Sequence, residues 1–241
     1  MNYLVDISYD GNNYHGWSKQ KNNISIQQTI EKGLNSIYKK KIDIVGSGRT
    51  DTKVHAIHQY FNFHEDEINL SVDKLRNALK NKIPADIKVN NIKVVDDNFN
   101  ARYDVKNKTY LYLINTNEFD LFRNNYLLNY NKPINLDLWN QAKELFIGTH
   151  DFLSFSKSAL TNTTRTINEI KITDSKGLIK IYINGNGFLR NMVRMIVGSL
   201  IDLNENKKSL ADIKRLIDNP KKGSANTLAN PSGLYLYKVN Y

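Results

Sequence analysis

The order of strand and helix patterns along the chain is the feature that most constrains its fold. In the first hundred residues, stretches with an apolar residue at every second position alternate with two stretches that have an apolar helical face. The expected strands lie near residues 3–9, 42–45, 57–63 and 87–95, and the helical faces are Ile26–Ile37 and a shorter one with Leu75 and Leu79. Ser25 followed by Gln28 predicts a capping box at the start of the first helix. The order β-α-β-β-α-β is that of the ferredoxin-like unit.

The second half of the sequence repeats this order. Its expected strands and helical faces are, in chain order, a strand at 110–114, a helix at 138–146, strands at 170–172 and 179–183, a helix at 192–203 and a closing strand at 234–239. One additional helix is expected at 209–217. We therefore expect an α+β fold of two tandem ferredoxin-like units, which form a mixed, mainly antiparallel sheet with a central cleft. The first unit spans residues 1–100 and the second residues 101–241.

The composition excludes several classes of protein. The chain of 241 residues has no cysteine, so it has neither disulfides nor a thiolate metal site, which fits a cytoplasmic location. Its longest apolar run, Met192–Leu200, contains Arg194 and is far too short for a membrane helix. The start, MNYLVDISYDG, lacks the basic and apolar regions of a signal peptide. We therefore expect no association with a membrane.

The net charge of +10 favours a polyanionic partner such as a nucleic acid. However, 26 of the 34 basic residues are lysine, and the chain also has 34 asparagines. A general enrichment of the sequence in lysine and asparagine therefore accounts for part of the positive charge. The positions of the eight arginines are therefore better evidence about function than the net charge is.

The stretch GSGRTDTKVHA, residues 46–56, follows an expected strand and contains two closely spaced glycines. Gly46 and Gly48 permit an abrupt turn because glycine adopts backbone conformations that other residues avoid. A phosphate-binding loop is disfavoured because no GxxxxGK[ST] motif is present. Two interpretations remain: a hairpin with polar side chains, or a turn in which Arg49 keeps Asp51 ionised as a nucleophile or base.

Two further stretches contain candidate functional residues. Tyr110, in the expected strand of NKTYLYLIN, is either a half-buried sheet residue or a ring that stacks on a nucleobase. In GFLRNMVRMIVG, residues 187–198, we expect Arg190 and Arg194 on one face of an apolar helix, where an arginine needs an anionic partner or substrate. The five histidines have no spacing typical of metal ligands, so we expect no metal site.

Six stretches together resemble the tRNA pseudouridine synthase A family, and the resemblance covers essentially the whole chain. They are, in the family's order, YDGNNYHGW (9–17), GSGRTDTKVHA (46–56), ARYDVKNKTYLY (101–112), GTHDFLSF (148–155), GFLRNMVRMIVG (187–198) and GLYLYKVNY (233–241). Lys53 stands where the family usually has glycine, and Ser18 replaces a usual glutamine. The resemblance implies the pseudouridine synthase fold.

It also implies roles for five residues. Asp51 would be the catalytic aspartate, whose attack on the uridine or its ribose breaks the N-glycosidic bond. The freed uracil would then rotate and rejoin the sugar through C5. Tyr110 would stack on the target base, Arg49 would help hold the target nucleotide out of the helical stack, Arg194 would pair with Asp51, and Leu234 would pack beside the active site.

The resemblance further implies a homodimer that acts on the anticodon stem-loop of tRNA without a cofactor or a metal. Two alternatives stay open. The same chemistry could act on another RNA such as ribosomal RNA, or the chain could be a non-catalytic RNA-binding protein of two RRM-like units. The second alternative is disfavoured because neither half has the RNP1 pattern of glycine and alternating aromatic residues.

Overall fold

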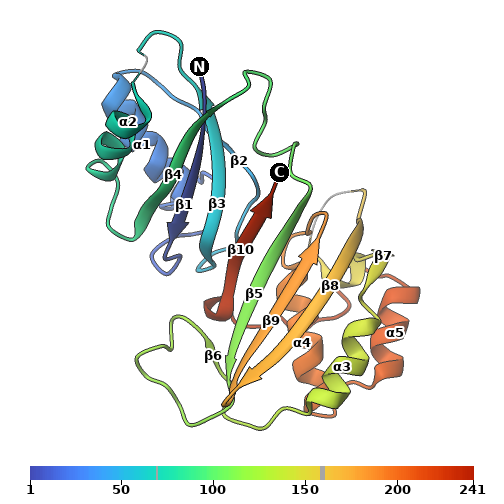
Figure 1. The fold of residues 1–241 in the computed structure, drawn as a ribbon. Helices are drawn as coiled ribbons and strands as arrows, with labels where there is room; N and C mark the ends of the chain where they lie inside the picture. Colours follow the sequence, from blue (N-terminus) through green and yellow to red (C-terminus); the bar gives the residue numbers. More distant parts are fainter. Residues whose placement is uncertain (69, 158–160) are drawn as a thin grey trace. The chain divides into compact units, whose positions relative to one another are not determined.

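The structure is a computed structural model that describes residues 1–68, 70–157 and 161–241 (Figure 1). In these ranges the chain forms ten strands and five α-helices, and most neighbouring strands are antiparallel. The expected α+β class with a mixed, mainly antiparallel sheet is therefore confirmed. No helix in these ranges is both long enough and apolar enough to cross a membrane.

The chain divides into two compact units, which are described separately. The first contains residues Met1–Lys106 together with Tyr235–Tyr241, and the second contains Asn107–Leu234. The division at residue 100 inferred from the sequence differs from this one mainly at the C-terminus, where the last seven residues belong to the first unit.

The first unit has the expected β-α-β-β-α-β order. Its elements are β1 (Asn2–Tyr9), α1 (Ile26–Tyr38), β2 (Val45–Gly46), β3 (His55–His64), α2 (Val72–Lys80) and β4 (Ile87–Val95). β1 lies in the centre and pairs antiparallel with β3 on one side and β4 on the other. β2 pairs antiparallel with β3, and β10 (Leu234–Asn240) pairs with the start of β3 in the parallel sense.

Two helices cover one face of this sheet (Figure 1). The apolar side of α1 is fully buried at Ile26, Ile30 and Leu34, as its helical periodicity predicts. The Ser25 side chain caps the helix by accepting a hydrogen bond of 3.3 Å from the Gln28 backbone N–H, which is one of the two bonds of the expected capping box. It ends at Lys39, which has a left-handed backbone conformation with φ of +57°.

A pair of buried asparagines fixes the segment that follows β4. Asn62 on β3 donates to the Asn2 side chain (2.9 Å) and accepts from the Ala101 N–H (2.9 Å). Asn2 in turn donates to the backbone carbonyls of Asp96 and Phe99 at 2.9 and 2.8 Å. Both side-chain amides are almost completely buried. Their hydrogen bonds therefore supply the partners that water would otherwise give to the polar backbone groups of this segment.

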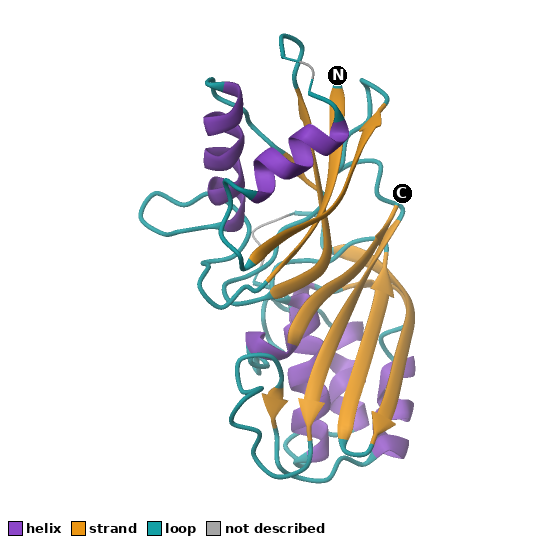
Figure 2. Ribbon diagram, turned by 60° about the vertical axis from the view of Figure 1, so that its left-hand side comes forward, coloured by secondary structure: helices purple, strands orange, loops and turns teal. Residues whose placement is uncertain are grey.

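The second unit is built around an antiparallel sheet with the order β5–β9–β8–β7. Its strands are β5 (Asn107–Asn115), β6 (Leu128–Asn129), β7 (Gly148–Asp151), β8 (Thr164–Ser175) and β9 (Leu178–Gly185). Its α-helices are α3 (Leu136–Glu144), α4 (Met192–Asn204) and α5 (Leu210–Asp218), and two short 3-10 turns lie at Leu153–Phe155 and Pro231–Gly233. The helices of this unit lie on one face of its sheet (Figure 2).

One expectation about the second unit is wrong. Arg190 does not share a helical face with Arg194, because α4 begins only at Met192. Asn191 precedes the helix with φ of +67°, a left-handed conformation that separates Arg190 from the helical turn. The Arg190 carbonyl instead accepts hydrogen bonds from the Lys157 N–H (3.3 Å) and the Ser156 hydroxyl (3.2 Å).

The buried asparagine pair leads to a prediction about stability. Asn62→Ala should lower the free energy of unfolding by about 1–3 kcal/mol, because it leaves the buried Ala101 N–H and Asn2 side-chain oxygen without partners. Urea denaturation followed by fluorescence measures this loss. Asn22→Ala, at an exposed position, is the control and should change the value by less than about 0.5 kcal/mol. Equal effects of the two substitutions would contradict the structural role of Asn62.

Candidate active site

The stretch around Asp51 connects β2 to β3 and ends in a tight turn, so the hairpin interpretation of the sequence is correct. The Val54 N–H donates to the Asp51 carbonyl at 3.2 Å, which closes a four-residue turn over Asp51–Val54. Asp51 is partly exposed and Thr50 is buried. The hairpin therefore presents a carboxylate, and the two interpretations of the sequence are compatible.

The segment Tyr9–Trp17 holds this turn in place through three hydrogen bonds. The Trp17 N–H donates to the Thr50 carbonyl (3.1 Å), and the Lys53 N–H donates to the Tyr14 carbonyl (3.2 Å). The Tyr9 hydroxyl lies 2.7 Å from the Thr50 hydroxyl in a buried contact. The N-terminal motif of the sequence thus fixes the backbone on both sides of Asp51.

Two glycines of the same segment lie directly against the turn. A Cβ at Gly11 would lie 2.1 Å from the Val54 carbonyl oxygen, and one at Gly16 would lie 2.5 Å from the Thr50 carbonyl oxygen. Gly16 also has φ of +85°, which residues with a side chain rarely adopt. Both positions therefore exclude any side chain, and this close approach of two backbones is what the glycines of YDGNNYHGW provide.

Buried aromatic and polar side chains anchor the segment itself. The Tyr14 hydroxyl donates to the Asp86 carboxylate at 2.6 Å, and burial together with this bond raises the pKa of Tyr14. The Gly11 N–H donates to Nδ1 of His55, whose ring is buried and stacked on Tyr235. His55 therefore has a structural role in this unit.

The glycine-rich half of the connection is fixed in a similar way. A Cβ at Gly46 would lie 2.5 Å from the indole ring of Trp17, so only glycine lets the two segments meet. The Gln59 side chain on β3 accepts from the Ser47 hydroxyl and donates to the Gly48 carbonyl at 2.8 Å. The chain is thereby held from Gly46 as far as Val54.

Arg49 is exposed on this connection. None of the ion pairs found within residues 1–68, 70–157 and 161–241 involves it. The effect of Arg49 on the ionisation of Asp51 therefore stays a prediction. An exposed guanidinium is available for a phosphate or a base.

In the second unit, the sequence candidate Tyr110 lies on β5, opposite Ile183 of β9. Its ring is buried and meets the edge of the Phe188 ring, with the centroids 5.0 Å apart and the planes at 81°. Edge-to-face contacts of this kind are favourable and orient the ring. The sequence did not single out Phe188, because no periodicity pairs it with a residue 78 positions earlier.

Arg194 forms hydrogen bonds with the loop of the second unit that precedes Leu234. Nε of Arg194 donates to the Ala229 carbonyl at 2.7 Å, and the Ala229 N–H donates back to the Arg194 carbonyl at 3.1 Å. The next residue, Asn230, accepts from the Tyr112 hydroxyl at 2.7 Å. Burial raises the pKa of Tyr112, and the positive charge of Arg194 opposes this rise.

Leu234 follows this loop directly and is buried. Tyr110 and Tyr112 alternate with Leu111 along β5, so their side chains point to the same face of the strand. The structure therefore places Tyr110, Arg194 and Leu234 in one region of the second unit, and Arg49 and Asp51 in the first unit.

The described residues offer no obvious metal site. No group of three or more histidine, cysteine, aspartate or glutamate side chains within them is arranged to hold a metal ion.

Comparison with known proteins gives the family. The model of the family described as tRNA pseudouridine synthase matches residues 7–104 and 142–241. The chain belongs to this family. It is 47% identical over 242 residues to tRNA pseudouridine synthase A of Ureaplasma urealyticum, with both chains covered completely. It is 37% identical to the protein of the same name from a Thermoanaerobacter species, over 100% of this chain and 99% of the other.

The matched ranges bear on the candidate residues in different ways. The turn with Arg49 and Asp51 lies in the first matched range, and Arg194 and Leu234 lie in the second. Tyr110 falls between the two ranges, but the full-length relatives cover it. The catalytic roles of all five residues remain predictions.

The close packing of Gly11 on the turn leads to a second prediction. Gly11→Ala should destabilise the protein by about 1–3 kcal/mol, because its Cβ would overlap the Val54 carbonyl and force the turn to move. Hydrogen exchange of the Lys53 and Val54 amides should become faster, since both donate hydrogen bonds that define the turn.

Gly187→Ala is the matched control for this experiment. A Cβ there would meet only the Arg165 side chain at 3.6 Å, an ordinary van der Waals distance. It should leave both stability and the exchange of the two amides nearly unchanged. Unaltered exchange in Gly11→Ala would show that the N-terminal segment does not hold the turn.

Proposed function

We propose that this protein is an isomerase that converts uridine to pseudouridine in tRNA. The observation that carries the proposal is the similarity to proteins named tRNA pseudouridine synthase A over the entire length of both chains. The turn that presents Asp51 supports it, since its backbone is held by hydrogen bonds and a carboxylate is a competent nucleophile.

The proposed reaction begins with attack of the Asp51 carboxylate on the uridine or its ribose. The bond between N1 of uracil and C1′ of the ribose breaks, and the uracil remains bound and rotates. C5 then forms the new bond to C1′, the bond that Asp51 had formed breaks and its carboxylate is regenerated, C5 loses its proton, and N1 is protonated in the product. One C–N bond is thus exchanged for one C–C bond within one substrate, so the overall reaction needs no hydride or phosphoryl donor.

Four other residues have proposed roles in this reaction. The ring of Tyr110 stacks on the target base, and its position against Phe188 supports this role because it fixes the plane of the ring. Arg49 helps to hold the target nucleotide out of the stack, for which an exposed guanidinium is suited. Arg194 supplies positive charge for the site, and Leu234 provides an apolar wall.

Stacking and positive charge are needed because the target uridine is enclosed in a stem. Extrusion of a base from a helix costs a few kcal/mol, on the order of one lost stacking step. A tyrosine that stacks on the extruded base and cations that bind the flanking phosphates offset this cost. The net charge of +10 is consistent with such binding.

The proposed substrate is the anticodon stem-loop of tRNA, and the proposed location is the cytoplasm. Both follow from the resemblance to the tRNA pseudouridine synthase A family. Ribosomal RNA is the main alternative substrate, and mapping of pseudouridine in total cellular RNA distinguishes the two.

Asp51→Asn tests both the reaction and the substrate. Cells in which this variant is the only copy should lose pseudouridine from the anticodon stem-loop of tRNA, because an amide cannot act as the nucleophile. The purified variant should fold, bind tRNA and show at least a thousandfold lower rate, roughly the size of effect seen when one member of a catalytic group is removed.

Asp97→Asn is the control, because Asp97 is exposed and follows the end of β4 that pairs with Asn2, at the opposite end of β1 from Tyr9 and the turn. It should retain the wild-type rate. Turnover by Asp51→Asn within about tenfold of wild type would overturn the proposed chemistry, since one lost nucleophile costs far more than that. Loss of pseudouridine from ribosomal RNA alone would keep the chemistry and exclude tRNA as the substrate.

We further propose that the protein works as a homodimer, as the family resemblance implies. The loop between β5 and β6 supports this proposal because it exposes several large apolar side chains. Phe119 is 57% exposed, Leu121 69% and Phe122 91%. Exposed apolar side chains gathered on one loop are typical of interaction surfaces.

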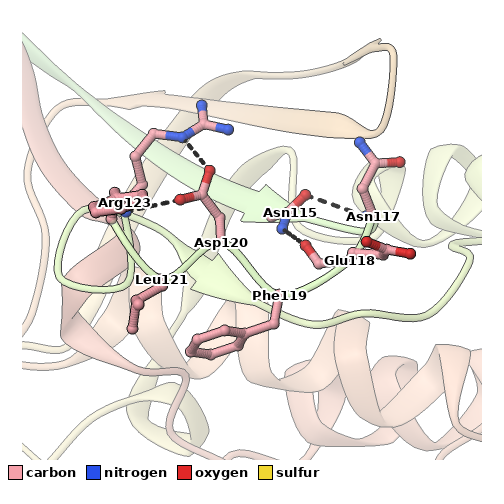
Figure 3. Close-up of a pocket in the computed structure, with 8 residues that line it drawn as sticks. Asn115, Asn117, Glu118, Phe119, Asp120, Leu121 and Arg123 are labelled. Carbon is pink, nitrogen blue, oxygen red and sulfur yellow. Dashed lines mark hydrogen bonds and ion pairs between the residues drawn. The ribbon is translucent and has the colours of Figure 1, made fainter.

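This loop is held in a defined shape, as an interface requires. The Asn115 side chain donates to the Glu118 carbonyl (2.7 Å) and accepts from the Asn117 N–H (3.1 Å). Asp120 accepts two bonds from Arg123, one from the backbone N–H and one from Nε, and these bonds lower the pKa of its carboxyl. Figure 3 shows Phe119 and Leu121 on one side of the loop and the Asp120–Arg123 pair on the other.

The dimer proposal predicts an effect of these side chains on association. The wild-type protein should sediment at twice the monomer mass. Replacement of both Phe119 and Phe122 by Ser should raise the dimer dissociation constant at least about tenfold, because each buried phenyl ring contributes about 1.5–3 kcal/mol. Ile24→Ser, at a position that is 63% exposed, is the control and should leave the dimer intact. A wild-type protein that sediments as a monomer would overturn the proposal.

A further inference from the structure

The turn that presents Asp51 contains a lysine in an unfavourable backbone conformation. Lys53 is the third residue of the turn closed by the Val54 N–H and the Asp51 carbonyl, and its φ is +63°. Positive φ at this position favours glycine or asparagine, because a Cβ crowds the neighbouring carbonyl. Unfavourable backbone conformations persist where the surrounding structure holds them, and they are frequent at functional sites.

The structure holds Lys53 firmly at its backbone and leaves its side chain exposed. Its N–H donates to the Tyr14 carbonyl, and the buried Tyr14 is anchored in turn by Asp86. Within the described ranges of the chain, none of the ion pairs involves Lys53, and its side chain is exposed to solvent. The turn therefore fixes the backbone from which this cation extends, two residues after Asp51.

Two other lysines show that the backbone conformation alone does not indicate a function. Lys39 at the end of α1 and Lys176 in the hairpin between β8 and β9 also have positive φ, +57° and +54°. Both end or reverse a secondary-structure element and are exposed. Lys53 differs from them because it shares one rigid turn with the candidate nucleophile.

We infer that the Lys53 ammonium group binds an RNA phosphate next to the target uridine. This inference rests on the proposed function, in which Asp51 meets the extruded nucleotide. The Cα atoms of Asp51 and Lys53 are at most about 7 Å apart, so the flanking phosphates are the anions that an RNA substrate brings closest to this cation. A lysine serves this purpose as a compact charge on a flexible stem.

The contact predicts a change in the salt dependence of RNA binding. Each phosphate that a cation neutralises contributes close to one unit to the slope of log K against log salt concentration. In an Asp51→Asn background, which prevents turnover, Lys53→Asn should weaken binding of an unmodified tRNA transcript. The slope should become less steep by about one unit. Asparagine is chosen because it tolerates positive φ, so the substitution removes the charge without adding strain.

Three variants in the same background complete the experiment. Lys53→Arg keeps the charge and should retain the wild-type slope. Lys53→Gly removes both charge and strain and should behave as Lys53→Asn does. Lys39→Asn removes a lysine with the same backbone conformation from the same unit, and it should leave the slope unchanged.

The possible outcomes separate this inference from the proposed function. If Lys53→Asn and Lys39→Asn give the same slope, Lys53 contacts no phosphate and the inference is wrong. A slope change confined to Lys53 supports it, even if the otherwise unaltered protein forms no pseudouridine in any RNA. In that case the proposed reaction fails, while the phosphate contact stands.

Discussion

The close contact between two backbone segments of the first unit determines the geometry of the candidate site. The turn at Asp51–Val54 and the segment Tyr9–Trp17 approach so closely that Gly11 and Gly16 have no room for a Cβ. Hydrogen bonds at Thr50 and Lys53 connect the two segments. The backbone that carries the Asp51 carboxylate is thus held in place by the fold itself, which is the main advantage of a preorganised site.

The second unit orients its candidate residues by a different device. The loop at Ala229 and Asn230 is hydrogen-bonded both to Arg194 on α4 and to Tyr112 on β5, the strand that also carries Tyr110. Since Arg194 uses one guanidinium N–H for the Ala229 carbonyl, its remaining N–H groups point in directions set by that bond. The first unit thus fixes its carboxylate through backbone packing, while the second orients a cation and a ring through side-chain contacts.

Local patterns in the sequence were sufficient for most of the fold. The strand expected within residues 87–95 and the cap at Ser25 are both present, because alternation and capping depend on neighbouring residues alone. The placement of Arg190 on a helix was wrong, since the left-handed conformation at Asn191 is not visible in an apolar periodicity. The pairing of β10 with β3 was also missed, because it joins residues far apart in the chain.

The site shows the same division between local and long-range information. The sequence singled out Asp51 and its glycines, but it did not explain the motif at residues 9–17, which has no helical or strand period. That motif acts through contacts with a turn 33 to 43 residues later, and only a three-dimensional arrangement reveals them. The carboxylate was predictable from local chemistry, whereas its support was not.

Because the chain is rich in lysine, the function of a lysine has to be inferred from its position in the structure and not from the net charge. Within residues 1–68, 70–157 and 161–241, seven residues other than glycine have positive φ, and they are four asparagines and three lysines, the two residue types in which this sequence is richest. Asparagine adopts this conformation at a lower cost than lysine, so each lysine there is either a consequence of composition or retained for its charge. The net charge cannot separate these two explanations, because it counts all lysines equally. The position of each lysine relative to a reactive group does separate them. Among these three lysines, only Lys53 shares a turn with Asp51.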